Sequence, residues 1–165
     1  MTAPAEDPPE PQAAPGRHER GTADIVPGTS SVEVRLEQAA SLPEALAAGF
    51  DAFEVIRMAA RECQDRAPEL FAAFMTAADA AVDGREALTV APSLPQVAAA
   101  GPGDPVAANA DPGQVAAALA VLAGLLGDRL GEVAALADLA NDRAACNDAA
   151  HAAGQISQLM SRGDP

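Results

Sequence analysis

The stretch FDAFEVIRMAARECQDRAPELFAAFM, residues 50–75, concentrates the bulky side chains of this chain. It contains all four Phe residues of the sequence, two of its four Met residues and one of its two Cys residues, and the chain has no Trp and no Tyr. A large side chain contributes about 1.5–3 kcal/mol when buried, whereas a methyl group contributes roughly 0.8 kcal/mol. Since more than half of the hydrophobic residues are Ala, we expect a thin core of closely packed helices centred on this stretch.

The first half of the stretch continues a helix pattern that begins at Ser41. Ser41 is a favourable N-cap, Pro43 is tolerated in a first turn, and Glu44 stands three residues after the cap, as in a capping box. From there apolar residues recur at steps of three and four, which is one face of a helix. The pattern predicts a helix over residues 42–66. Its predicted buried residues are Leu46, Phe50, Phe53, Ile56, Ala60, Cys63 and Ala67.

A second helix is expected from Pro68. Proline lacks a backbone N–H and disfavours the helical conformation in the residue before it, so the chain should break there. The helix is predicted over residues 68–83, and Gly84 is expected to end it as a left-handed cap. All four Phe residues then lie on two adjacent buried faces, which indicates a core; a small apolar-ligand pocket between the helices is the alternative. The second buried face comprises Phe71, Phe74, Met75, Ala78 and Val82.

Two short segments on either side of this helix pair predict a two-stranded ribbon. In SVEVRLEQ, residues 31–38, Val and Leu alternate with Glu and Arg, which is typical of a half-buried strand, although a helix start also fits. We place one strand at residues 32–37 and the other in the β-branched segment at residues 87–91. The predicted fold is therefore mainly α, with a strand–helix–helix–strand unit over residues 31–91.

The pattern of residues 113–160 predicts a long C-terminal helix or a helical hairpin. Asp111 and Pro112 are a favourable N-cap and first helical position. One uninterrupted helix would be about 70 Å long, and its glycines weaken it, so we favour a bend near Gly127, with a dimeric coiled coil as the alternative. Arg129 interrupts the heptad-like apolar stripe of this segment. In coiled coils, a polar residue at such a position commonly sets the register of the paired helices. The stripe predicts partner contacts at Leu119, Leu122, Leu126 and Val133.

Two segments are rich in Pro and poor in bulky side chains. Residues 1–30 contain six Pro and residues 92–112 contain five. Such segments bury too little apolar surface to offset the entropy of ordering the chain. We therefore predict a disordered tail over residues 1–30 and a linker over residues 92–112, which would separate the unit at residues 31–91 from the C-terminal helical segment.

The charge, the apolar runs and the cysteine content of the chain argue against several classes of function. The net charge is −14, and the acidic residues are spread along the chain, as is typical of soluble proteins. Nucleic-acid binding requires clustered cations and is not expected. The longest apolar run, Val115–Gly127, is shorter than the roughly 20 residues of a membrane span. Two Cys residues are too few for a disulfide framework and the N-terminus lacks the pattern of a secretory signal, so we predict a cytoplasmic protein.

Few residues offer a pattern typical of catalysis or metal binding. Cys63 falls on the predicted buried stripe, where Cys acts as a small hydrophobe. Cys146 and His151 are five positions apart on a helix and diverge, whereas zinc requires four converging ligands. No nucleophile elbow and no phosphate-binding loop is present. We therefore predict no catalytic residue, no metal site and no cofactor.

These patterns favour a non-enzymatic helical protein that acts by interaction or oligomerisation, with a protein partner or as a homodimer. The alternative is a helical protein that binds a small apolar ligand or a metal. Convergence of polar groups on a cavity would distinguish the two, because ligand sites combine a cavity with a few placed polar groups.

Overall fold

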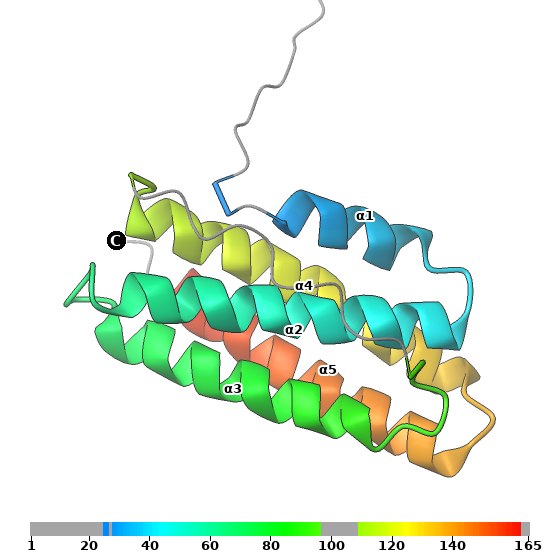
Figure 1. Ribbon diagram of the computed structural model, residues 1–165. Coiled ribbons are helices and arrows are strands. Elements are labelled where there is room, and N and C mark those ends of the chain that lie inside the picture. Colours follow the sequence, from blue (N-terminus) through cyan, green and yellow to red (C-terminus); the bar gives the residue numbers. More distant parts are fainter. Residues whose placement is uncertain (1–24, 27, 97–108, 163–165) are drawn as a thin grey trace, which may run out of the picture.

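The computed structural model describes residues 25–26, 28–96 and 109–162. All regular secondary structure within these residues is helical, which confirms the mainly α prediction. Four long helices form a bundle, and a short fifth helix packs on its outside (Figure 1). The helices are α1 (Thr29–Gln38), α2 (Leu42–Gln64), α3 (Phe71–Thr89), α4 (Pro112–Leu136) and α5 (Ala140–Ser161).

The bundle consists of two helical hairpins joined by one crossover. Helix α2 packs on α3, α3 on α5, α5 on α4 and α4 on α2, so each helix has two neighbours. Neighbouring helices are antiparallel, whereas α3 and α4 run in the same direction (Figure 1). The chain therefore passes from one end of the bundle to the other between α3 and α4. One long crossover of this kind is a known way of connecting a four-helix bundle.

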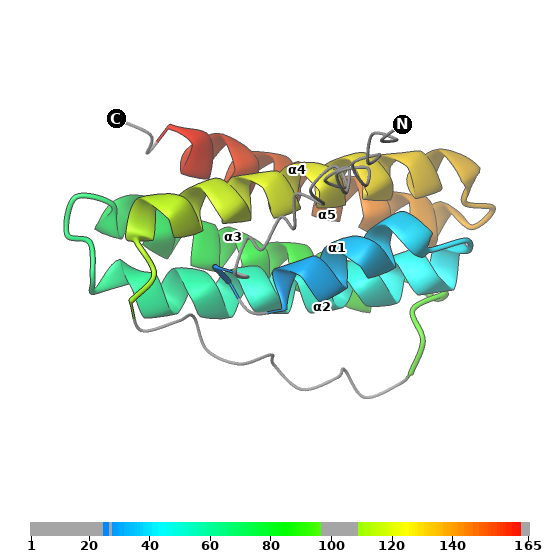
Figure 2. The same cartoon turned by 90° about the horizontal axis from the view of Figure 1, so that it is seen from above.

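Helix α1 lies outside the bundle along α2 and α4 (Figure 2). Arg35 of α1 forms an ion pair with Asp51 of α2, at 2.6 Å. At the other side, the guanidinium of Arg129 in α4 donates a hydrogen bond to the carbonyl of Ala39, the C-cap residue of α1. A cation at this position satisfies a terminal carbonyl and complements the helix dipole. Arg129 thus attaches α1 to the bundle.

The predicted two-stranded ribbon is wrong. Residues 32–37 lie in α1, and residues 87–91 form the end of α3 and the turn that follows it. The alternating pattern also places Val32 and Leu36 one helical turn apart. The helix buries these two side chains and leaves Val34 47% exposed, whereas a strand would have placed all three on one face.

The helix starts predicted from capping residues are confirmed. Ser41 accepts a hydrogen bond from the backbone N–H of Glu44 at the start of α2, and Asp111 accepts one from that of Gln114 at the start of α4. The carboxylate of Glu44 accepts from the N–H of Ala40, at 2.8 Å, one residue before the position expected in a capping box. Caps depend on residues close in sequence, which explains why they were predictable.

The predicted ends of the first helix pair need correction. Helix α2 ends at Gln64, and turns separate it from α3, which starts at Phe71 rather than at Pro68. Gly84 does not end α3; the helix continues to Thr89, and Gly28 is the one described glycine with a left-handed backbone. Gly84 lies against the ring of Phe53 instead, where a side chain would not fit.

The C-terminal segment forms the hairpin, with its break at a different place from the predicted one. Helix α4 continues through Gly127 and ends at Leu136. Gly127 faces α5, and a Cβ at this position would lie 3.5 Å from the carbonyl oxygen of Ala150 and 3.6 Å from the Cβ of Ala153. The glycine therefore allows the two helices to approach closely and does not mark the bend.

A single hydrophobic core runs through the bundle. It includes Phe53 and Phe74, both 0% exposed, together with residues of α4 and α5. Helices of the unit at residues 31–91 therefore share their core with the C-terminal hairpin. Most of the predicted tail and linker lies outside the described residues. No helix in the described part of the chain is long and apolar enough to cross a membrane.

Candidate interaction face

The four residues predicted to contact a partner lie inside the bundle. Leu119, Leu122 and Leu126 are 0% exposed and Val133 is 6% exposed. The apolar stripe of α4 is covered by other helices of the same chain, chiefly α5 and α2. A second chain would reach these side chains only if the bundle opened, so contact through them stays a prediction about an opened state.

The two cysteines and His151 do not come together. Cys63 lies in the last turn of α2 and Cys146 in the second turn of α5, at opposite ends of the bundle, because these helices run in the same direction (Figure 1). Both thiols are buried, and His151 is exposed. Burial raises the pKa of Cys63, and burial together with Asp142 raises the pKa of Cys146 to about 11. Both thiols are therefore protonated at neutral pH and poor nucleophiles.

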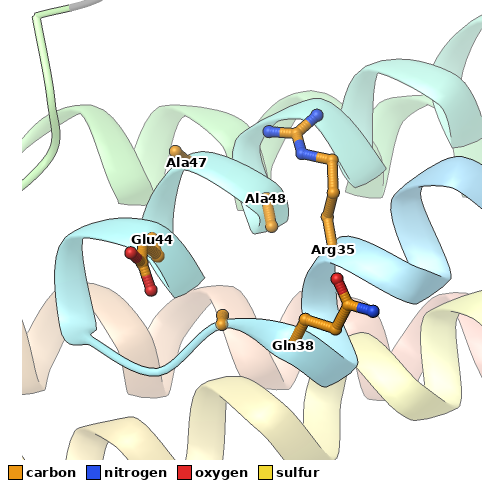
Figure 3. Close-up of a pocket in the computed structure, with 6 residues that line it drawn as sticks. Arg35, Gln38, Glu44, Ala47 and Ala48 are labelled. Carbon is orange, nitrogen blue, oxygen red and sulfur yellow. The ribbon is translucent and has the colours of Figure 1, made fainter.

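A hollow of about 290 Å³ opens between α1 and α2 (Figure 3). Its two charged side chains already have partners: Arg35 pairs with Asp51, and Glu44 accepts from the N–H of Ala40. In Figure 3 the guanidinium and the carboxylate lie on opposite sides of the hollow. The polar groups do not converge, so the hollow lacks the arrangement typical of a ligand site. Its lining comprises Arg35, Gln38, Ala39, Glu44, Ala47 and Ala48.

A charged cluster joins α2 to α3 at the surface. Glu54 of α2 binds Arg57 through both carboxylate oxygens, with Nε at 3.0 Å and Nη2 at 2.6 Å. Arg85 of α3 donates to the same carboxylate at 2.8 Å. The guanidinium carbon of Arg85 also lies 4.3 Å from the ring centroid of Phe50, a cation–π distance. The side chains of Arg57 and Arg85 are 28% and 35% exposed, so both reach solvent.

Helical spacing extends this cluster into a longer surface, which we call the α2–α3 face. Residues three or four apart share one side of a helix. The contacts of Arg85 with Glu54 and Phe50 bring the two helix sides together. The α2–α3 face comprises Phe50, Glu54, Arg57, Arg61 and the C-cap residue Asp65 of α2, and Phe71, Met75, Asp79, Val82, Arg85 and Glu86 of α3.

Two bulky apolar side chains of this face are exposed. Phe71 and Met75 occupy the first turns of α3 and are 41% and 42% exposed. Because α2 and α3 are antiparallel (Figure 1), these turns lie beside the half of α2 that carries Arg57 and Arg61. Burial of both side chains was predicted and is wrong. Their positions share a helix side with Arg85. This spacing of apolar and basic residues in the sequence was the signal from which their exposure could have been predicted.

The α2–α3 face mixes both signs of charge. It carries three Arg and four acidic residues, a formal charge of −1, and the whole chain carries −14. The hydrogen bonds from Arg57, with the charges of Arg57 and Arg85, hold the pKa of Glu54 below its usual value despite partial burial. Glu54 is therefore ionised at neutral pH and orients the two guanidinium groups.

The other exposed apolar side chains among the described residues do not form such a face. Val34 and Val121 stand on different helices, Leu136 is the last residue of α4, and Val90 and Leu139 are cap residues at helix ends. Single exposed apolar residues are common on soluble proteins and need no functional explanation.

The buried carboxylate of Asp142 has a structural partner. It accepts hydrogen bonds from the backbone N–H of Ser93, at 3.0 Å, and from its hydroxyl, at 2.7 Å. These bonds attach the segment after α3 to the first turn of α5. Asp142 is 1% exposed, so it cannot bind a partner at the surface.

No family model, no curated protein and no solved structure matches this chain. The geometry and exposure of the α2–α3 face therefore carry the functional argument.

Proposed function

We propose that this chain is a non-enzymatic helical protein that binds another protein through the α2–α3 face. The observation that supports the proposal is the exposure of Phe71 and Met75 beside a row of arginines. Aromatic residues, Met and Arg are enriched in protein interfaces, whereas most other charged residues are depleted there. Arg is also one of the residue types that dominate binding energy at protein interfaces.

The face is held ready for contact by the helices beneath it. Glu54 fixes the orientation of Arg57 and Arg85, and Phe50 stacks under Arg85. Ordering side chains in advance lowers the entropy that a partner must overcome on binding. The face therefore has the character of a preformed binding surface.

The proposal includes a protein partner, not a nucleic acid, and a cytoplasmic location. The charge of −14 opposes association with polyanions. Cys63 and Cys146 are unpaired, which suits a reducing compartment. Homodimerisation is the competing form of interaction, and light scattering of the purified protein at increasing concentration distinguishes it from binding to another protein.

Site-specific photo-crosslinking in living cells tests the proposal. A photoreactive residue at position 75 should yield discrete crosslinked species with another protein, and the same residue at position 121 should not. Val121 is the matched control, because it is 66% exposed on α4, outside the face. Identical crosslinks from both positions, or none from position 75, would contradict binding through the α2–α3 face.

A further inference from the structure

We infer that α1 exchanges between two copies of this chain, so that the groove formed by α2 and α4 accepts α1 of a second copy in place of its own. Helix α1 lies along this groove on the outside of the bundle (Figure 2). The groove is separate from the α2–α3 face, because Asp51 and Arg129, which bind α1, do not belong to that face. Exchange therefore leaves the α2–α3 face free for its own partner.

The groove selects a helix by burial and by two polar contacts. Val32 and Leu36 of α1 are 4% and 0% exposed, so the bundle covers both side chains. Arg35 pairs with Asp51 of α2 at 2.6 Å, and Arg129 of α4 donates to the carbonyl of the C-cap residue of α1. These contacts fix the direction and the register of α1. Every copy of the chain carries the same helix, so an exchanged α1 repeats each contact, as in domain swapping.

The contacts of α1 are limited enough for it to leave the bundle without unfolding it. The helix has ten residues, of which Thr29, Val32 and Leu36 are buried, and no side chain caps its start. The hollow of about 290 Å³ also lies between α1 and α2, so their packing is incomplete. Elements with few buried contacts open locally at a lower free-energy cost than global unfolding. A detached helix of this length is marginal in water and gains by docking again, on its own chain or on another.

The connection between α1 and α2 is short and suits a hinge. Three residues, Ala39–Ser41, separate the two helices. Ser41 is extended and Ala39 has a non-helical ψ of 109°, and a few such residues are enough to redirect a helix. Pro43 in the first turn of α2 lacks a backbone N–H, which prevents α1 and α2 from merging into one continuous helix. Short hinge loops favour exchange, because turning back onto the same chain constrains them most.

Salt should increase the exchange. Each copy carries −14, so two copies repel each other at low salt. The Arg35–Asp51 pair is present before and after exchange, so its screening affects both states alike. Raising salt from about 0.05 M to about 0.5 M weakens the repulsion between copies and should therefore raise the dimer fraction. A dimer that dissociates as salt rises would contradict the inference.

Complementary charge reversal tests the inference on the full chain. Arg35→Glu and Asp51→Arg each place like charges at the α1 contact, in the closed chain and in a homodimer. In an exchanged heterodimer of the two variants, each groove receives the helix of opposite charge, so both ion pairs are restored. We expect the mixture to dimerise with a dissociation constant about tenfold lower than that of either variant alone. Analytical ultracentrifugation measures the constant, and native mass spectrometry identifies the heterodimer.

A mixture of Arg162→Glu with Asp148→Arg is the matched control. Both residues are exposed, one at the end of α5 and one within it, and these variants carry the same net charges as the test pair. If the test pair associates no more tightly than its separate components, or no more tightly than the control mixture, exchange of α1 is overturned.

Hinge length gives a second measurement that changes no charge. Deleting Ala40 shortens the connection and strains the closed chain, so the dimer fraction should rise. Inserting two glycines after Ala40 relaxes the closed chain, so the dimer fraction should be lowest in this variant. Circular dichroism verifies that each bundle is folded. A deletion variant as monomeric as the insertion variant would contradict exchange, and crosslinking from position 75 would still test the α2–α3 face separately.

Discussion

The backbone of Gly84 in α3 lies so close to the ring of Phe53 in α2 that a Cβ at residue 84 would stand 2.4 Å from the ring Cζ. Phe53 is 0% exposed and cannot move toward solvent. Gly84→Ala should therefore destabilise the protein by about 1–3 kcal/mol through overpacking, although Ala favours a helix over Gly by about 1 kcal/mol. Chemical denaturation measures the change.

Gly131→Ala is the matched control for this substitution. Gly131 is exposed on α4, and a Cβ there would meet no atom within 4 Å. Only the helix preference remains, so this change should stabilise the protein by up to about 1 kcal/mol. Phe53→Leu should partly rescue Gly84→Ala. Equal effects of the two glycine substitutions would show that Gly84 and Phe53 are not in close contact.

Replacing Asp142 should loosen the segment that follows α3. Asp142→Ala leaves the two donors of Ser93 without their acceptor, which should cost about 1–3 kcal/mol. Proteolysis within residues 92–112 should become faster at the same time. Asp148→Ala, an exposed position on α5, is the control and should change neither stability nor cleavage. Unchanged cleavage in Asp142→Ala would show that the Ser93–Asp142 bonds do not anchor this segment.

Neighbouring residues of α4 distinguish a closed bundle from an opened dimer. Leu122 is 0% exposed and Val121 is 66% exposed. Leu122→Asp should unfold the whole chain, because it buries an unpaired charge. Val121→Asp should change the free energy of unfolding by no more than about 0.5 kcal/mol. Circular dichroism and light scattering give both readouts. A folded monomer from Leu122→Asp, made from a dimeric wild type, would support partner contact through the α4 stripe.

The attachment of α1 depends on Arg129. Arg129→Leu removes the hydrogen bond to the carbonyl of Ala39, so α1 should detach more often while the bundle stays folded. Hydrogen exchange should accelerate in residues 29–38 and not in α5. Arg162→Leu provides the control, because Arg162 is exposed at the end of α5. Uniform acceleration throughout the chain would mean that α1 and the bundle unfold together.

The Glu54 cluster makes stability depend on pH in a defined window. The folded state holds the pKa of Glu54 below its ordinary 4.5, first through the hydrogen bonds from Arg57. The stabilisation that results from this lowered pKa is fully present above the pKa of Glu54 in the unfolded chain. It is lost as the pH falls through the lower pKa that Glu54 has in the folded state. Glu54→Gln should cost roughly 1–2 kcal/mol at neutral pH, and its difference from wild type should shrink below pH 4.5. A difference that is constant from neutral to acidic pH would contradict the ion-pair cluster.

The sequence by itself determined the local features of this protein. Ser41 and Asp111 predicted the starts of α2 and α4. Such starts can be predicted from sequence because a cap is a contact between residues three positions apart. The spacing of Phe53 and Phe74 placed both in the core, because helical periodicity follows from 3.6 residues per turn. Glu54 and Arg57 were identifiable as neighbours for the same reason.

Only the tertiary structure decided features that depend on contacts distant in sequence. Gly84 and Gly127 resembled helix breaks, and packing against Phe53 and α5 gave them a different role. The alternating pattern of residues 32–37 fitted either a strand or a helix. The segment is a helix because its apolar side chains pack against α2 and α4. Phe71 and Met75 lie on the α2–α3 face because the order of helices around the bundle covers the opposite side of α3. Periodicity alone does not determine which helix will lie on which side, since that order follows from how the whole chain buries its apolar surface.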